Sequence, residues 1–152
     1  MTMARASAYK MQWTRETIFQ ELVRVLVDAL GVDADEDGVG DLDNMEVRLA
    51  TDLGAESVDF LDIAFQVKKR FGVLVAGSEL FFAGVTQSHA PHFHEYVAKD
   101  GTLTEVGVEE LLKRTPWMPW DGDIVKKGVL VSNLFTVGYI VHYLEKKLGV
   151  VS

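Results

Sequence analysis

A serine set among carboxylates is the part of this sequence best suited to chemistry. The stretch from Asp52 to Asp62 reads Asp-Leu-Gly-Ala-Glu-Ser-Val-Asp-Phe-Leu-Asp, and Ser57 stands where a helical pattern begins. A hydroxyl at a helix start is exposed at the positive end of the helix dipole, so it suits a covalently attached phosphate. Gly54 adds a loose backbone that lets an enzyme approach. The simpler alternative is that Ser57 is only an N-cap residue.

This stretch resembles the attachment loop of acyl carrier proteins, which reads Asp-Leu-Gly-Ala-Asp-Ser-Leu-Asp. The chain departs from that pattern at Glu56 and Val58, and both replacements keep the chemical character. The resemblance implies that a transferase attaches 4'-phosphopantetheine to Ser57 and that the thiol of this arm carries an acyl group as a thioester. It also implies that Glu56, Asp59 and Asp62, with Val58, dock onto basic patches of partner enzymes.

An acidic loop could bind a metal ion. From Asp33 to Asn44 it places Asp33, Asp35 and Asp37 at the spacing of a calcium-binding EF-hand loop. Asn44, however, stands where such a loop needs a bidentate glutamate. We therefore favour a solvated acidic loop between helices.

A histidine cluster is the other candidate for metal binding. His89, His92 and His94, with Glu95, could hold zinc if an extended segment turned two imidazoles to the same side. Clustered histidines without a complete motif are more often surface or packing residues. We therefore predict no metal site.

Three amphipathic helices are expected to position the serine. The first runs from a cap at Thr14 to Gly31, the second from about Ser57 to Gly72, and the last from Thr136 to Gly149. By resemblance they are the first, second and last helices of a four-helix carrier bundle. The apolar stripe predicted for the second helix consists of Phe60, Ile63, Ala64, Val67 and Phe71, widened by Val58, Leu61 and Phe65. Its cationic end, Lys68-Lys69-Arg70, departs from the family and indicates either dipole stabilisation or a changed set of partners.

Residues 76–129 are predicted to be a mainly helical insertion between the second and last helices. We expect a short helix from Ser78, a loop from His89 to His94, and a helix from Thr104 to Arg114, with a strand or buried helix within residues 121–133. The insertion is rich in aromatic residues, unlike a flexible linker. Four of them could line an acyl pocket, although an ordinary core is favoured: Phe81, Phe82, Trp117 and Trp120.

The composition of the chain limits the classes of function that it can have. The 152 residues suit one soluble globular domain, and the lack of cysteine excludes disulfides and fits a reducing cytoplasm. No apolar run is long enough to span a membrane. The formal net charge of the chain is −8. Residues 32–67 carry a net charge of −10, because they contain eleven acidic residues and a single basic residue, Arg48. Such a surface repels nucleic acid and anionic membranes and attracts basic partner surfaces.

The sequence thus predicts an all-α, single-domain acyl carrier (residues 1–152) for fatty-acid or specialised lipid biosynthesis. We expect a cytoplasmic monomer whose partners are a phosphopantetheinyl transferase and enzymes that make or transfer acyl chains. It is not expected to be an enzyme, because no nucleophile and base pair has motif support. The alternatives are a carrier of aminoacyl or polyketide intermediates, and an unmodified regulatory or metal-binding module on a carrier-like scaffold.

Overall fold

Five α-helices lie in the parts of the chain that the structure describes. The computed structural model describes residues 13–35, 39–40, 45–73, 80, 93–120 and 130–150, with the backbone alone at Ser57 and Ser132. The helices are α2 (Arg15–Leu30), α3 (Ser57–Phe71), α6 (Phe93–Tyr96), α7 (Glu105–Arg114) and α9 (Val137–Leu148), and a 3₁₀ turn, η1 (Val131–Asn133), precedes α9. Within these ranges there are isolated β-bridges but no strand. The all-α prediction is confirmed.

Helices begin and end at the predicted residues. Threonine hydroxyls accept a hydrogen bond from a first-turn N–H at three helix starts: Thr14 for α2, Thr104 for α7 and Thr136 for α9. Glycines with left-handed backbone end three helices: Gly31, Gly72 and Gly149. These signals act within a few residues of each helix end, through a threonine hydroxyl or a glycine backbone, so they could be read from the sequence.

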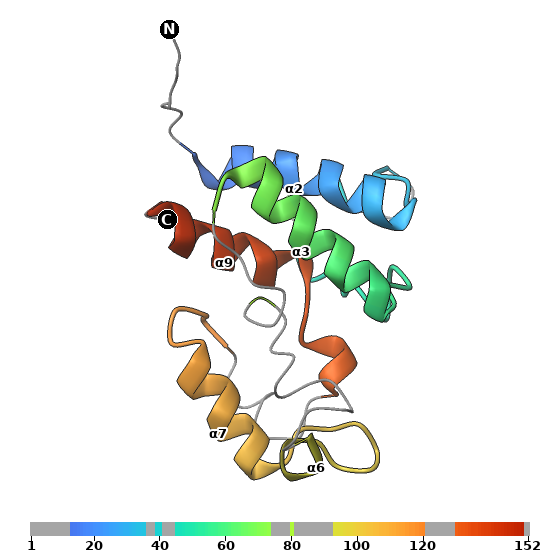
Figure 1. Ribbon diagram of the computed structural model, residues 1–152, viewed down its shortest axis with the longest axis vertical. Helices are drawn as coiled ribbons and strands as arrows, with labels where there is room; N and C mark the ends of the chain where they lie inside the picture. Colours follow the sequence, from blue (N-terminus) through green and yellow to red (C-terminus); the bar gives the residue numbers. More distant parts are fainter. Residues whose placement is uncertain are drawn as a thin grey trace, which may run out of the picture.

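Helices α2, α3 and α9 form the bundle, in which α2 packs against both of the others (Figure 1). The interior is made by apolar side chains spaced three or four residues apart on each helix. Its fully buried members include Ile18, Leu22 and Leu26 of α2, Ile63 and Val67 of α3, and Ile140 and Leu144 of α9. Burial of each such side chain contributes about 1.5–3 kcal/mol before conformational entropy is counted.

Ion pairs tie the bundle helices together at both ends of α2. The guanidinium of Arg15 donates two hydrogen bonds to the carboxylate of Glu145, at 3.1 and 2.9 Å. Glu145 is only 4% exposed, so removing Arg15 would leave a buried charge without its cation. At the end of α3, Arg70 donates to Glu21 at 3.0 Å and to Asp28 at 2.7 Å, both on α2.

Helices α6 and α7 pack together in a separate part of the molecule, below the bundle in Figure 1. The N–H of Thr104 donates to the carbonyl of Tyr96 at 2.9 Å, and its hydroxyl donates to the carbonyl of Glu95 at 2.6 Å. Gly107 of α7 lies so close that an added Cβ would collide with the Tyr96 carbonyl. A glycine is therefore required where the two helices meet.

One sequence prediction for this region needs correction. Others concern residues that lie wholly or mostly outside the described ranges. The loop predicted from His89 to His94 is wrong at its end, because His94 lies in α6. The N–H of Val97 donates to the carbonyl of Phe93 at 2.8 Å and closes that helical turn. Of the short helix predicted from Ser78, only Leu80 is described. Phe81, Phe82 and residues 121–129 lie outside the described ranges.

An aromatic cluster joins the segment after α7 to α9. The rings of Trp117 and Trp120 lie 5.6 and 5.9 Å from that of Tyr139, and Trp117 is also 5.7 Å from Tyr143. The indole N–H of Trp120 donates to the Thr115 hydroxyl at 2.8 Å. Both tryptophans are half-buried against the core, as the interpretation as ordinary core predicts.

Candidate functional site

Ser57 is the first residue of α3, and Glu56 occupies the N-cap position. The carboxylate of Asp59 accepts a hydrogen bond from the N–H of Glu56 at 2.8 Å, and the N–H of Asp59 donates to the carbonyl of Glu56 at 2.9 Å. The interpretation of Ser57 as an N-cap residue is therefore wrong. Helix initiation uses the residues on either side of the serine instead.

The turn before the serine is fixed by Arg48 and Asp52. We call residues 45–56 the serine loop. The Asp52 carboxylate accepts a hydrogen bond from the backbone N–H of Arg48 at 2.8 Å. It also accepts two hydrogen bonds from the guanidinium of Arg48, each at 3.2 Å. These hydrogen bonds from Arg48 hold the pKa of Asp52 below its usual value. Gly54 has left-handed backbone, and among the described residues no atom beyond Gly54 and its chain neighbours lies within 4 Å of where a Cβ would be. The loop is thus fixed in shape, and Gly54 is exposed.

The serine loop is also bound to the segment that leads into α9. The N–H of Leu49 donates to the carbonyl of Phe135, and the N–H of Val137 to the carbonyl of Val47, both at 2.9 Å. Gly138 donates to the carbonyl of Met45 at 2.8 Å. An added Cβ on Gly138 would lie 2.9 Å from that oxygen, so the approach needs a glycine. The starts of α3 and α9 are consequently held as one unit.

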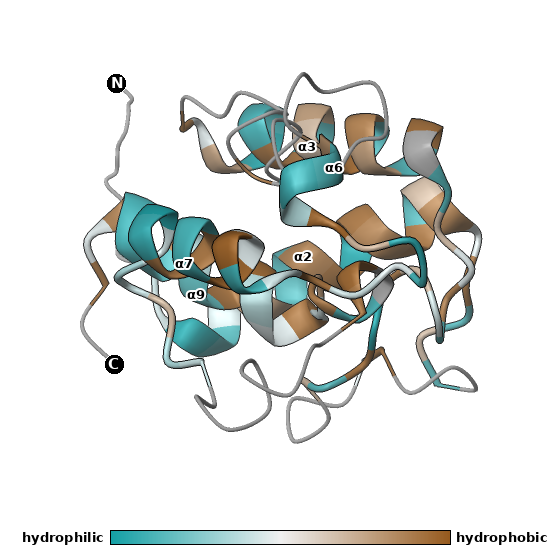
Figure 2. Ribbon diagram, turned by 90° about the horizontal axis from the view of Figure 1, so that it is seen from below, coloured by the Kyte–Doolittle hydropathy of each residue, from teal (hydrophilic) through white to brown (hydrophobic). Residues whose placement is uncertain are grey.

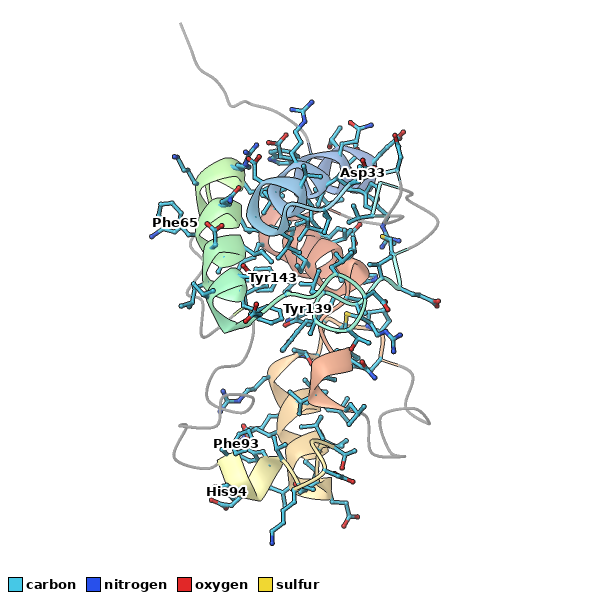
Figure 3. All side chains as sticks on the ribbon, turned by 90° about the vertical axis from the view of Figure 1, so that its right-hand side faces the viewer. Asp33, Phe65, Phe93, His94, Tyr139 and Tyr143 are labelled. Carbon is cyan, nitrogen blue, oxygen red and sulfur yellow. The ribbon has the colours of Figure 1, made fainter. Side chains whose placement is uncertain are left out.

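Three large apolar side chains of α3 are exposed rather than buried. Val58 is 69%, Leu61 60% and Phe65 63% exposed, and Phe65 points away from α2 and α9 in Figure 3. The prediction that they widen the buried stripe is wrong. Their spacing of three and seven residues places them on the side of α3 opposite Val67, which faces the core.

The three acids predicted to dock partners have different environments. Glu56 and Asp62 are exposed, and the Asp62 carboxylate accepts only long hydrogen bonds, of 3.3 and 3.4 Å, from Gln66. Asp59 is half-buried and engaged by the backbone of Glu56. Glu56 and Asp62 are therefore more exposed to solvent than Asp59.

The other end of α3 carries cations. Lys68 and Lys69 are exposed, and within the described residues neither ammonium group forms an ion pair, whereas Arg70 is held by α2. An open groove of about 540 Å³ lies beside this end of the helix. It is lined by Asp28, Asp62, Phe65, Gln66, Lys69 and Arg70.

The described residues contain no group of three His, Cys, Asp or Glu side chains able to hold a metal ion. His94 is exposed with its ring against Phe93, and lies at the far end of the molecule from α3 (Figure 3). The Asp33 carboxylate accepts a hydrogen bond from the N–H of Asp35 at 2.8 Å. The remaining candidate ligands lie outside the described ranges: Asp37, Asn44, His89 and His92.

Sequence reasoning missed three residues of the site. Arg48 forms an i, i+4 pair with Asp52, a spacing that indicates contact within a helical turn. Leu61 and Phe65 share a helical face with Val58, which a helical wheel would have shown.

In the described ranges no helix has the length and apolar character to cross a membrane.

Comparison with known proteins shows similarity to carriers of acyl groups. The chain is 36% identical to an acyl carrier protein of Thermotoga maritima over 67 residues, which are 44% of this chain and 75% of that protein. It is 36% identical to an acyl carrier protein of Coprothermobacter proteolyticus over 66 residues, 43% of this chain and 73% of that one. Identity to an acyl carrier protein of Petrotoga mobilis is 28% over 67 residues, 44% and 72% of the two chains. No family model and no solved structure matches the chain.

Proposed function

The chain belongs to the acyl carrier protein family, and we propose that it holds acyl groups as thioesters on a 4'-phosphopantetheine arm attached to Ser57. The observation that carries the proposal is the position of Ser57 as the first residue of α3, directly after the serine loop. First-turn N–H groups have no acceptor within their helix and lie at the positive end of its dipole. A phosphodiester on this residue is stabilised by both.

The residues around Ser57 fit such an attachment. Arg48 and Asp52 hold the serine loop, and Asp59 accepts a hydrogen bond from the N–H of Glu56, so side chains on both sides of the serine stabilise the helix start. Gly54 is exposed and would not be crowded at its Cβ position by other described residues, which supports the approach of a transferase. The arm supplies a thiol that accepts and releases acyl groups, and the chain positions it.

The proposed role is that of a carrier rather than a catalyst, and the similarity to acyl carrier proteins supports it. The proposed cargo is an acyl chain for fatty-acid or specialised lipid biosynthesis. The proposed partners are a phosphopantetheinyl transferase and enzymes that build or transfer that chain, met by a monomer in the cytoplasm. Their contact surface on this protein includes Glu56 and Asp62, with Val58, Leu61 and Phe65 as its exposed apolar part.

The test is covalent modification of the full-length protein. Incubation with coenzyme A and a broad-specificity phosphopantetheinyl transferase should add the mass of one phosphopantetheine, measured on the intact protein. Ser57→Ala should remove the addition entirely. Ser132→Ala, which replaces a serine of the 3₁₀ turn η1, should leave it unchanged. A wild-type mass that stays unmodified with several transferases would overturn the proposal.

A further inference from the structure

Charges of opposite sign are separated along α3. Glu56, Asp59 and Asp62 lie at its start, and Lys68, Lys69 and Arg70 form its last turn. Asp59 is engaged in the helix start, and Arg70 is neutralised by Glu21 and Asp28. The charges left to a partner are therefore acidic at one end and basic at the other.

The available charges and the exposed apolar residues share one face of the helix. Each of positions 58, 61, 62, 65, 68 and 69 lies three or four residues from another of them, so that together they cover one side of the helix. We call these six residues the outer face of α3. Along it, Val58, Leu61 and Asp62 lie toward the start of the helix, Lys68 and Lys69 lie toward its end, and Phe65 lies between Asp62 and the lysines.

The distance between the two ends lets a partner sense each sign separately. Asp62 and Lys69 are about two helical turns apart, or roughly 10 Å. Exposed charges are screened over about 8 Å at physiological ionic strength. A basic side chain placed against Lys69 would thus meet repulsion that the acids nearer Ser57 only weakly offset.

A groove lies beside the end of α3 that carries the lysines. Lys69 and Arg70 line it from α3 together with Phe65, Gln66 and the acid Asp62, and Asp28 lines it from α2 (the helix pair is seen in Figure 2). Because Arg70 is tied to Asp28, the groove wall is fixed, while the Lys69 ammonium has no ion-pair partner among the described residues. A short acidic side chain from a partner could sit against Lys69 with its apolar neighbours on Phe65.

We infer that the outer face of α3 selects partner enzymes with a two-signed docking surface. Such a partner places basic side chains near Glu56 and Asp62, apolar side chains on Leu61 and Phe65, and acidic side chains against Lys68 and Lys69. Enzymes whose docking surface is basic along its whole length are discriminated against by like-charge contact at the lysines. The inference rests on the proposed attachment at Ser57, because it concerns enzymes that must reach that residue.

The experiment uses a phosphopantetheinyl transferase with a uniformly basic docking surface as the probe. Its kcat/KM is measured with the wild-type protein, with K68E/K69E, and with the control K146E/K147E. The control makes the same charge change in the last turn of α9. Reversal on α3 should raise kcat/KM about three- to tenfold, and reversal on α9 should change it less than about twofold.

A second arm tests the attractive half of the inference. Replacing the transferase's basic residues opposite the end of α3 with glutamate should favour the wild-type protein over K68E/K69E, inverting the order seen with the parent enzyme.

Three outcomes would overturn the inference, and they are distinguishable. If the wild type is modified but the α3 and α9 reversals change the rate equally, partner selection by the lysines is wrong and attachment at Ser57 stands. If no transferase modifies the wild type, both proposals fail. If sedimentation shows a dimer that K68E/K69E dissociates, a second copy of the chain covers the outer face.

Discussion

Asp59 and Asp62 are neighbours on α3, yet their carboxylates have different roles. Asp59 binds the N–H of Glu56 at the helix start, whereas Asp62 makes only long contacts with Gln66 and stays exposed. The same charge therefore serves the fold at one position and is available to a partner at the other. The two effects can be separated by substitution.

Asp62→Lys should slow modification by a basic transferase about three- to tenfold without loss of stability, because the side chain is exposed and supports no other element. Asp59→Ala should lower the free energy of unfolding by about 0.5–2 kcal/mol, the usual effect of losing a capping interaction. Transferase kinetics and urea unfolding of both variants provide the check. Equal losses of stability would contradict the division of roles.

At the scale of the element, close approach of backbones decides how helices meet. Gly138 lies against Met45, and Gly107 lies against Tyr96, with no room for a Cβ at either contact. In an ordinary helix, replacing glycine with alanine stabilises by about 0.5–1 kcal/mol. At Gly107 and Gly138 the same replacement should instead lower the free energy of unfolding, because the added methyl group would force the paired segments apart.

Gly107→Ala should therefore loosen α6 against α7 while the bundle stays folded, because the bundle contacts of α2, α3 and α9 do not involve Gly107. Hydrogen exchange should show lost protection within residues 93–114 and unchanged protection in α2 and α9. Full protection throughout would mean that α7 can shift without cost, contrary to the tight contact with Tyr96.

The ends of the helices could be predicted from the sequence, because residues close to each end determine them. The buried face of a helix could not, because it depends on tertiary contacts. The hydroxyl of Thr14 accepts a hydrogen bond from the N–H of Thr17, and the N–H of Gly31 donates to the carbonyl of Val27, so each end of α2 is fixed by residues close to it in sequence. The burial of α3 was not predictable from apolar spacing alone, since Leu61 and Phe65 have the same apolar character as Ile63 but stay exposed. Neither was the role of Asp59, because Glu56 is an uncommon N-cap residue. Attachment at Ser57 remains a prediction from the motif and the position of the helix start.

At the scale of the whole molecule, a partly buried charged cluster links α2 to α9. Arg15 and Glu145 form an ion pair between α2 and α9, and His142 lies 3.5 Å from the same carboxylate. Burial lowers the pKa of His142 below 6.5, and the cation of Arg15 adds to this shift, while Glu145 opposes it. The folded protein thus takes up a proton at His142 less readily than the unfolded chain does.

Stability should consequently fall as the pH drops below about 6.5, where the unfolded chain binds more protons at this residue than the folded one. His142→Gln removes the titrating group, so the denaturant midpoint of the variant should change less between about pH 7.5 and about pH 5.5. Urea titrations at both pH values measure the difference. A variant with the wild-type dependence would show that other groups dominate this range.

The pairing of the serine loop with the segment before α9 also sets when the site can form. A ribosome makes residues 45–56 long before residues 133–138, and the hydrogen bonds of Leu49 and Met45 need Phe135 and Gly138. Closing a loop of this length costs entropy that only the finished contacts repay. A nascent chain therefore exposes Ser57 without its support, and the serine reaches its final setting only once the last helix has been synthesised.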